Sequence, residues 1–555
     1  MKRRTFCAML PIAGGLRLAA AEGRQPPRER LPFDHDWRFF LGDPSGAEAP
    51  SYDAAAWRRV DVPHDWSIEG RIDAKNPMGG AGGYFPAGIG WYRRSFAAPA
   101  AWKGRRVRVE FEGVYMNATV YLNGHELGTH PYGYTTFFHD LTPHLQPGAE
   151  NVLAVRVDQS KHRNSRWYAG SGIYRHVWLH VTGAVHVAPW GVFVTMPEAS
   201  AEQAKVAVKT RIANESASRS RLVLRTVIYN GAGAAAGQSE ASASLEPGES
   251  IVASQEIGVE KPALWAPESP NLYRAVTRVI EDGRTVDEVT TPFGVRSIEW
   301  SAARGFLLNG TPVKMAGGCV HHDNGPLGAA AFDRAEERRV RMLKEAGFNA
   351  IRTSHNPPSP AFLDACDRLG MLVMDEAFDC WSRGKNDYDY HLVFKDWWQR
   401  DIDAMVLRDR NHPSVVAWSI GNEIPERGEP LGAQEAKMLA DYLRGLDRTR
   451  PVTSALNNVG KWTETDGFYA ALDIGGYNYN LGNHAADHKR VPSRVMACTE
   501  SFPGATFADW AMVTDFPYIV GNFVWTAIDY LGESGLGRAT LRDAKDTSRE
   551  GYGAP

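Results

Sequence analysis

The sequence predicts three domains, namely two β-sandwiches followed by a (β/α)₈ barrel. At one domain per ~150 residues, a chain of 555 residues is long enough for three or four domains. Short alternating runs without a helical period fill residues 37–181 and 185–296, whereas strand-like and helical segments alternate after Trp300. These patterns give the order of the domains, and a hydrophobic content of 43% supplies their cores.

The first block is predicted to be a β-sandwich because turn residues separate its strand-like runs. Turn pairs such as Asn123-Gly124 and Pro147-Gly148 stand between these runs. The clearest runs are 91–96, 105–114, 117–124 and 151–158. Many short strands at this spacing are typical of a sandwich.

The second block has the length and strand number of an immunoglobulin-like sandwich. It covers roughly 110 residues and holds about seven possible strands, as such domains do. Its clearest alternating runs are 205–214, 221–230, 250–259 and 272–281. We therefore expect domains over residues 25–183, 184–297 and 298–555.

After Trp300, eight apolar strand-like runs predict a closed barrel of parallel strands. The runs are 313–320, 349–354, 371–377, 415–423, 451–456, 473–479, 494–500 and 518–526. Near-continuous apolar strands are covered on both faces, as in a (β/α)₈ barrel. The clearest helix starts at Asp333, where Glu336 completes a pattern like a capping box, and ends at Gly347. A doubly wound open sheet is the structural alternative, since a count of strands does not establish closure.

The first 24 residues have the features of an export signal. KRR at residues 2–4 forms a basic start, a short apolar stretch follows, and AAA at 19–21 offers small residues for cleavage. RRTF at residues 3–6 also resembles a twin-arginine signal, which serves proteins that fold before export. We therefore expect an exported protein, periplasmic or extracellular in a bacterium, with a disordered basic N-terminus as the alternative.

The composition argues against several functional classes. A net charge of -3 gives no field that would hold nucleic acid or anionic lipid. No run of about 20 apolar residues is present to span a membrane. The four cysteines after the presumed signal lack CxxC spacing, so we expect buried free thiols. There is no GxSxG, P-loop or GxGxxG motif for serine-hydrolase, nucleotide or dinucleotide chemistry.

Two glutamates that end strongly apolar runs, Glu423 and Glu500, are the candidate catalytic pair. In a (β/α)₈ barrel, catalytic side chains lie at the carboxyl ends of strands. Hydrolysis of a glycosidic bond needs two flanking carboxyl groups, ~5–5.5 Å apart in a retaining enzyme and farther apart in an inverting one. Their proximity is expected to raise the pKa of one and keep a proton on the acid. The alternative for each glutamate is a helix cap or a pair with a surface lysine.

Other polar residues at strand ends are candidates for binding substrate. Arg352 and His355 lie in a donor-rich loop suited to orienting a nucleophilic carboxylate, or to a plain structural turn. Asn422 could hold a substrate hydroxyl through a hydrogen bond that strengthens in the transition state. Trp525 could stack on a sugar ring or pack in the core.

The adjacent histidines His321 and His322 suggest a metal site at first sight. A catalytic zinc site usually needs about three protein ligands, and neighbouring residues on a strand point to opposite faces. Only one of the two can face the barrel mouth, so a hydrogen-bonding histidine is favoured over a metal ligand.

Six long motifs carry a resemblance to a known family. They are HDW (64–66), WYAGSGIYRHVWL (167–179), RTSHNPPSP (352–360), DRNHPSVVAWSIGNE (409–423), ACTES (497–501) and GNFVWTAIDYLGE (521–533). They closely resemble the family 2 glycoside hydrolases, particularly their bacterial β-galactosidases, over nearly all of the chain after the signal. The resemblance implies a sugar-binding-like jelly roll, an immunoglobulin-like sandwich and a catalytic TIM barrel, in the order predicted above.

The resemblance also implies roles for single residues. By position, Glu423 matches the family's acid/base and Glu500 its nucleophile. The substrate-pocket positions that it implies are Asp65, His322, His355, Asn422, Tyr479 and Trp525, with Arg352 near the nucleophile. Asp65, in HDW, would reach from the jelly roll toward a sugar hydroxyl.

The sequence departs from the family at metal positions and near its end. Well-known bacterial β-galactosidases of this family bind magnesium and sodium. Glu376 keeps one magnesium-ligand position, but a neighbouring position is Phe378, and Arg166 falls near where a sodium-binding aspartate is expected. We therefore expect no metal cofactor. Little apolar periodicity follows the eighth strand, so we also expect a short C-terminal end of the barrel, which would bear on activity.

The sequence thus predicts a retaining exo-β-glycosidase acting on an oligo- or polysaccharide, with terminal β-galactosides preferred. Another family 2 specificity, such as β-glucuronidase, β-mannosidase or α-arabinofuranosidase, is one alternative. A catalytically disabled carbohydrate-binding protein is another, and metal-dependent hydrolysis at His321 and His322 is the least favoured. A homo-oligomer is compatible with the sequence.

Overall fold

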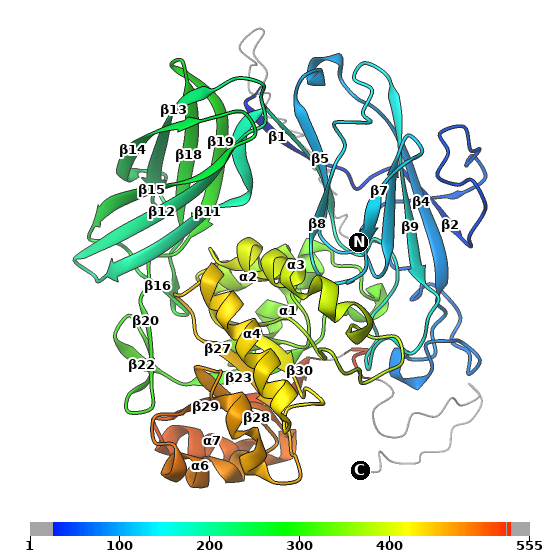
Figure 1. Ribbon diagram of the computed structural model, residues 1–555. Coiled ribbons are helices and arrows are strands. Elements are labelled where there is room, and N and C mark those ends of the chain that lie inside the picture. Colours follow the sequence, from blue (N-terminus) through cyan, green and yellow to red (C-terminus); the bar gives the residue numbers. More distant parts are fainter. Residues whose placement is uncertain (1–25, 529, 534–555) are drawn as a thin grey trace, which may run out of the picture.

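Residues 26–528 and 530–533 are described by the structure, a computed structural model of the chain (Figure 1). Two β-sandwiches, coloured blue to cyan and green, stand above a barrel coloured from green through yellow to red. The predicted signal at residues 1–24 and the tail at 534–555 lie outside the described residues. No helix in the described ranges is long and apolar enough to cross a membrane.

The first sandwich consists of two antiparallel sheets. The strand order of the smaller sheet is β1 (Arg28–Pro32), β10 (Val177–Thr182), β5 (Arg106–Phe111) and β8 (Phe137–Asp140). The larger sheet has the order β3 (Arg58–Val60), β2 (Trp37–Leu41), β4 (Gly88–Ala97), β9 (Glu150–Gln159), β6 (Ala118–Leu122) and β7 (His125–His130). All four predicted runs are strands here, and their apolar side chains, such as Val107 and Val109, form the core between the sheets.

The second sandwich has seven main strands, as the immunoglobulin-like prediction requires. One sheet is ordered β11 (Val185–Ala199), β12 (Gln203–Asn214) and β15 (Ser250–Glu260). The other is ordered β14 (Ala235–Leu245), β13 (Ser220–Tyr229), β18 (Tyr273–Glu281) and β19 (Arg284–Phe293). In β12 the buried Val206 and Val208 alternate with more exposed neighbours, which explains the period of two in the sequence. A short hairpin joins β16 (Trp265–Ala266) to β17 (Ser269–Pro270).

The third domain is a closed barrel of eight parallel strands, preceded by the small sheet β20 (Ile298–Ser301), β21 (Gly305–Leu308) and β22 (Thr311–Val313). The barrel strands are β23 (Met315–Val320), β24 (Ala350–Thr353), β25 (Leu372–Glu376), β26 (Val415–Asn422), β27 (Val452–Leu456), β28 (Ile474–Asn478), β29 (Val495–Ser501) and β30 (Ile519–Ile528). Pairing of β30 with β23, for example Gly521 with Met315, closes the ring. The closed ring confirms the barrel and rules out the open sheet.

Helices follow each of the first seven barrel strands in the described residues. They are α1 (Asp333–Glu345), α2 (Pro360–Leu369), α3 (His391–Asp409), α4 (Pro430–Leu446), α5 (Asp466–Tyr469), α6 (His484–Arg490) and α7 (Thr506–Asp515). The predicted helix starts at Asp333 as expected, but no capping box forms: Phe332 is the N-cap residue and makes no side-chain cap. Glu336 instead pairs with Arg339 and accepts from Ser359, because burial inside the domain favours a full set of partners.

The four cysteines of the described residues are buried free thiols, as expected. Burial raises the pKa of each, for instance that of Cys319 to about 12, so that they stay protonated and unreactive. They serve as small apolar side chains in the barrel.

Candidate active site

Three carboxyl ends of barrel strands bring together the central polar side chains of the site. Glu500 is the sixth residue of β29, Asn478 is the last residue of β28, and Glu423 follows the last residue of β26. Glu423 has a φ of +45°, and its backbone N–H donates to the carbonyl of Ala455 on β27 at 2.7 Å. A non-glycine residue in this left-handed region is uncommon, and such positions gather at functional sites.

Glu500 is buried, with 3% of its surface exposed. Nη1 of Arg352 donates to its Oε1 at 2.8 Å, and the Tyr479 hydroxyl also hydrogen-bonds the carboxyl group. Burial raises the pKa of Glu500 to about 7, while Arg352 lowers it and the charge of Glu423 raises it further. The carboxyl group therefore titrates near neutral pH.

Arg352 is the fully buried hub of the network around Glu500. Its guanidinium forms a two-pronged ion pair with Glu376 at 2.8–3.0 Å and donates to Oδ1 of Asn422 at 2.9 Å. Burial alone would raise the pKa of Glu376, but the charge of Arg352 brings it below its usual value. Ser419 and His355 occupy the remaining positions on Glu376, at 2.6 and 2.7 Å. Such a saturated, charge-assisted network fixes the position of Arg352.

A chain of hydrogen bonds joins the two candidate catalytic carboxyl groups. Nδ2 of Asn478 donates to Oε1 of Glu423 and to Oδ1 of Asn422, both at 3.1 Å. Arg352 contacts Asn422 on one side and Glu500 on the other. Both glutamates thus belong to one hydrogen-bonded network, and the charge of Glu423 acts on Glu500.

The raised pKa differs from the sequence-based expectation. A pair of carboxyl groups was expected to keep a proton on the acid, Glu423. In the structure the raised pKa belongs to Glu500, the predicted nucleophile, and its largest cause is burial. Glu500 is buried among its partners, and the effect of this burial exceeds that of the nearby Arg352 charge.

His355 and Trp525 form one wall of the site. Nδ1 of His355 lies 2.7 Å from Glu376, and its Nε2 lies 3.3 Å from Nδ2 of Asn422 and 4.0 Å from Oε1 of Glu500. Burial lowers the pKa of His355 to about 3, against the effect of Glu376, so the imidazole is neutral. The Trp525 ring stacks on the imidazole with centroids 5.1 Å apart and an interplanar angle of 2°.

Of the two adjacent histidines, the structure turns His321 and not His322 toward the site. The His321 ring packs against His355 and Trp525. His322 faces the first sandwich, where its Nε2 lies 3.1 Å from the carbonyl oxygen of Ala169. The expectation that the pair faces opposite sides holds, but the resemblance selected the wrong member for the pocket. Alternation along β23 and its extension explains why only one can face the mouth.

Asp65 links the first sandwich to the barrel and does not lie among the other site residues. Its Oδ1 accepts from the backbone N–H groups of Ser67 and Ser171, both at 2.9 Å. Its Oδ2 accepts from the Tyr168 hydroxyl at 2.6 Å and from the N–H of Ala329, in the barrel, at 2.8 Å. Four protein donors hold this buried carboxylate, which corrects the expectation that it reaches a sugar hydroxyl.

Sequence reasoning missed an ionic group that the first sandwich completes. Arg166 makes a two-pronged pair with Asp379 at 2.8 and 2.9 Å and contacts Glu533 at 3.0 Å. Asp379 also accepts from Lys385 at 2.7 Å and from Asn422 at 3.0 Å. Asp379 stands three residues beyond the end of β25, so the rule that active residues follow barrel strands could have found it, as it could have found Asn478.

The residues at the family's metal positions do not fit a metal ion. Both oxygens of Glu376 are taken by Arg352, His355 and Ser419, and a cation there would meet the guanidinium. Phe378 stacks on Tyr390 with centroids 4.7 Å apart, in an apolar cluster. At the sodium position, the guanidinium of Arg166 already pairs with two carboxylates. Hard cations need oxygen ligands that are free to coordinate.

A partly open cavity of about 850 Å³, including its mouth, lies next to this network. Side chains of both the first sandwich and the barrel line it, among them Trp167, Tyr132, His355 and Asp379. Glu423 and Glu500 do not line it, whereas His355 and Asp379 of the network do. The network around the two carboxyl groups, and not this cavity, is therefore the candidate site of the chemistry, because hydrolysis of a glycosidic bond needs two carboxyl groups.

Comparisons with known proteins match the three domains in order. Models of glycosyl hydrolases family 2 cover residues 34–183 (sugar binding domain), 185–296 and 302–528 (TIM barrel domain). The beta-galactosidase BoGH2A of Bacteroides ovatus is 40% identical over 91% of this chain and 68% of its own length. A putative beta-glucuronidase of Formosa agariphila is 34% identical over 91% of this chain and 52% of its own length.

Solved structures agree with these relatives. A family 2 member from Bacteroides cellulosilyticus superposes with a TM-score of 0.89 and 44% identity, over 91% of this chain and 65% of that one. The chain thus spans about half to two thirds of the length of the proteins that it matches. By its sequence and its three-domain fold, the chain belongs to glycosyl hydrolases family 2.

Proposed function

We propose that the chain is a retaining exo-β-glycosidase that removes terminal β-galactosides, with Glu423 as acid/base and Glu500 as nucleophile. The observation that carries this proposal is the hydrogen-bonded chain that joins the two carboxyl groups through Arg352, Asn422 and Asn478. The name of the Bacteroides ovatus relative supports the galactoside, although other relatives are named as beta-glucuronidases.

In the first step, Glu500 as carboxylate attacks the anomeric carbon of the terminal sugar. The bond from that carbon to the glycosidic oxygen breaks, and its electron pair stays with the oxygen, which takes the proton of Glu423. Arg352 and the Tyr479 hydroxyl stabilise the charge of Glu500 before the attack. The products are a glycosyl ester of Glu500 and the released alcohol.

In the second step, Glu423 acts as a base. It takes a proton from water, whose oxygen bonds to the anomeric carbon while the ester bond to Glu500 breaks. Glu500 leaves as a carboxylate, the sugar keeps its original anomeric configuration, and Glu423 is protonated again. The partial exposure of Glu423 supports this role, since both water and the leaving group must reach it.

The proposal is tested with aryl β-galactosides and substitutions of each glutamate. Glu500→Ala is expected to lose at least about 10⁴-fold in kcat. Glu423→Ala should keep more activity on substrates with a good leaving group, and azide should rescue it and give a β-galactosyl azide. Glu429→Ala is the control, because Glu429 pairs with Arg383 on the surface. Undiminished hydrolysis by Glu500→Ala, or a product with inverted configuration, would contradict the proposal.

Export is a separate part of the proposal. RRTF at residues 3–6 supports transport of a folded protein, and the buried free thiols of the mature part are compatible with folding before export. Fractionation of bacteria that express the chain tests this: replacing Arg3 and Arg4 by Lys should retain the protein in the cytoplasm.

A further inference from the structure

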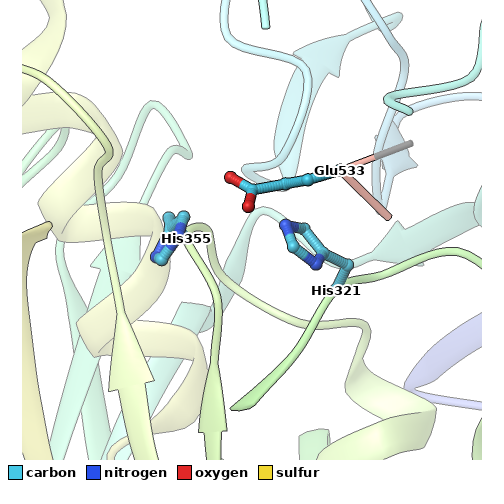
Figure 2. A group of neighbouring side chains, drawn as sticks. All are labelled: His321, His355 and Glu533. Atoms are coloured by element: carbon cyan, nitrogen blue, oxygen red, sulfur yellow. The ribbon is translucent and has the colours of Figure 1, made fainter. Parts of the chain in front are cut away.

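Glu533, which follows β30, places a carboxylate between two histidines of the site (Figure 2). One ligand atom from each of Glu533, His321 and His355 lies within 4.8 Å of the other two. The side chain of Glu533 is 6% exposed. This carboxylate therefore belongs to the enclosed part of the site, although it stands far from Glu423 and Glu500 in the sequence.

The first sandwich fixes the position of this carboxylate. Nη1 of Arg166 lies 3.0 Å from Oε1 of Glu533, while the same guanidinium makes its two-pronged pair with Asp379. One guanidinium is thus shared by two carboxylates, of which Asp379 also pairs with Lys385 at 2.7 Å. Arg166 is a positioning residue for Glu533, since it holds the side chain from outside the barrel.

His355 lies between the nucleophile and Glu533. Its Nε2 is 4.0 Å from Oε1 of Glu500, and the imidazole is also a neighbour of the Glu533 carboxylate. A hexose with its anomeric carbon at Glu500 would pass along His355 and Trp525. Its far end, which carries the hydroxyl groups of carbons 4 and 6, would then meet Glu533.

We propose that Glu533 selects neutral terminal hexoses and excludes uronic acids, by accepting hydrogen bonds from hydroxyl groups at the end of the sugar opposite the scissile bond. This inference rests on the proposed function and refines it to one substrate class. A hydroxyl group can donate to the carboxylate, whereas the carboxylate of a glucuronide would meet a like charge without a donated proton. A site built to bind a hydroxyl group rejects strongly a substrate that lacks it.

The cations near this end of the site support the same selection. Arg352 is bound by Glu376 and Glu500, Arg166 by Asp379 and Glu533, and Lys385 by Asp379. Each of these three cations already has carboxylate partners within the described residues. A uronic acid would therefore have to compete with a protein carboxylate for any of them.

A divalent metal is the other occupant that this group of side chains suggests. Two imidazoles and a carboxylate are the ligands of many zinc sites, and Glu376 supports His355 as an outer carboxylate would. The guanidinium of Arg166 on Glu533 opposes a second cation at that carboxylate. The geometry therefore favours a sugar hydroxyl over a metal, and the experiment below separates the two.

The test compares 4-nitrophenyl β-galactoside with 4-nitrophenyl β-glucuronide. The unmodified chain is expected to favour the galactoside by at least about 100-fold in kcat/KM. In Glu533→Gln, kcat/KM for the galactoside should fall roughly 10–100-fold, as expected for a lost hydrogen bond to a charged group, and the preference should shrink as the glucuronide loses the repulsion. Glu429→Gln is the matched control, since it removes a carboxylate from a surface pair with Arg383 and should change neither value.

Equal rates on both glycosides, or a preference that is unchanged in Glu533→Gln, would overturn the inference and leave the proposed function intact. If no glycoside is turned over, the proposed function fails, and binding then decides the inference. Calorimetry on the unmodified chain should give tighter binding of galactose than of glucuronic acid, and equal affinities would refute the selection. Zinc bound at one equivalent by the unmodified chain but not by Glu533→Gln would also refute it, in favour of a metal site.

Discussion

The two sandwiches contact opposite ends of the barrel. The first sandwich reaches the carboxyl ends of the strands: the Tyr132 hydroxyl donates to the carbonyl of Ala377 at 2.7 Å, just after β25. The second reaches the amino ends: Arg296 donates to the carbonyl of Val415, the first residue of β26, at 2.7 Å. At the same end, Asn411 exchanges hydrogen bonds with the backbone of β11.

This difference predicts which of the two sandwiches contributes to the proposed chemistry. Active sites of such barrels form at the carboxyl ends of the strands, and the opposite face contributes stability. Side chains of the first sandwich, such as Trp167, pack within 5.4 Å of the rings of His321 and His355. We therefore expect changes at the first interface to alter activity and changes at the second to alter stability alone.

Loss of Arg166 should give the largest effect on activity at the first interface. Arg166→Ala leaves Glu533 without this cation and Asp379 with Lys385 alone, and removing one partner of a buried pair costs at most about 3–5 kcal/mol. We expect kcat/KM on an aryl β-galactoside to fall roughly 10²–10³-fold in a protein that still folds by circular dichroism. An unchanged kcat/KM would show that the first sandwich only supports the barrel.

Asp65 tests whether the first interface also contributes stability. Asp65→Ala removes the acceptor of four donors, including the N–H of Ala329 in the barrel. Buried donors left without a partner should lower the free energy of unfolding by about 3 kcal/mol, measured by urea titration. Asp73→Ala is the control at an exposed aspartate. An equal loss of unfolding free energy in that variant would contradict the role of Asp65 as a link between the first sandwich and the barrel.

A substitution at Tyr479, inside the barrel, gives an effect on activity with which the effects at both interfaces can be compared. As the proposed nucleophile, Glu500 must be ionised to attack, and its pKa is raised to about 7, so kcat/KM should rise as the pH rises through about 7. Tyr479→Phe removes a hydrogen bond that lowers this pKa, so the acid limb should move to higher pH, with a loss of roughly tenfold below neutral pH. An acid limb that stays in place would mean that another group controls it.

The smallest effect is expected at the second interface. Asn411→Ala removes two hydrogen bonds to the backbone of Val192 and Val194 in β11, at 2.8 and 2.9 Å. We expect the free energy of unfolding, measured by urea titration, to fall by about 1–2 kcal/mol. The value of kcat/KM should be unchanged under conditions where both proteins are fully folded. A fall in kcat/KM comparable to that of Arg166→Ala would remove the distinction between the two sandwiches.

Much of the fold was predictable because the burial of a strand requires apolar residues at regular positions in the sequence. All eight apolar runs after Trp300 are barrel strands, and the alternating runs of the first two blocks are sandwich strands. The capping box at Asp333 and Glu336 failed for the opposite reason. The polar side chains of such a short pattern can hydrogen-bond to many different groups. In the folded domain, tertiary contacts bring Glu336 to Arg339 and Ser359.

The site was predictable where a residue's position follows from its own strand. Glu423 and Glu500 were found because each ends a buried run, and Asn422 and Arg352 were found in the same way or by resemblance. The assignment of His322 and Asp65 to the pocket was wrong because orientation depends on what the first sandwich presents to the barrel. Ala169 and Tyr168 of that sandwich take up these two side chains.

The sequence by itself determined the order of the domains, the eight candidate barrel strands and the two candidate glutamates. All of these follow from local patterns of burial and from the ends of strands. Only the tertiary structure decided that Arg166, from the first sandwich, meets Asp379 and Glu533 of the barrel, 213 and 367 residues away. The physical reason is that the partners of a buried charge are set by the packing of whole domains, and no local period in the sequence records it.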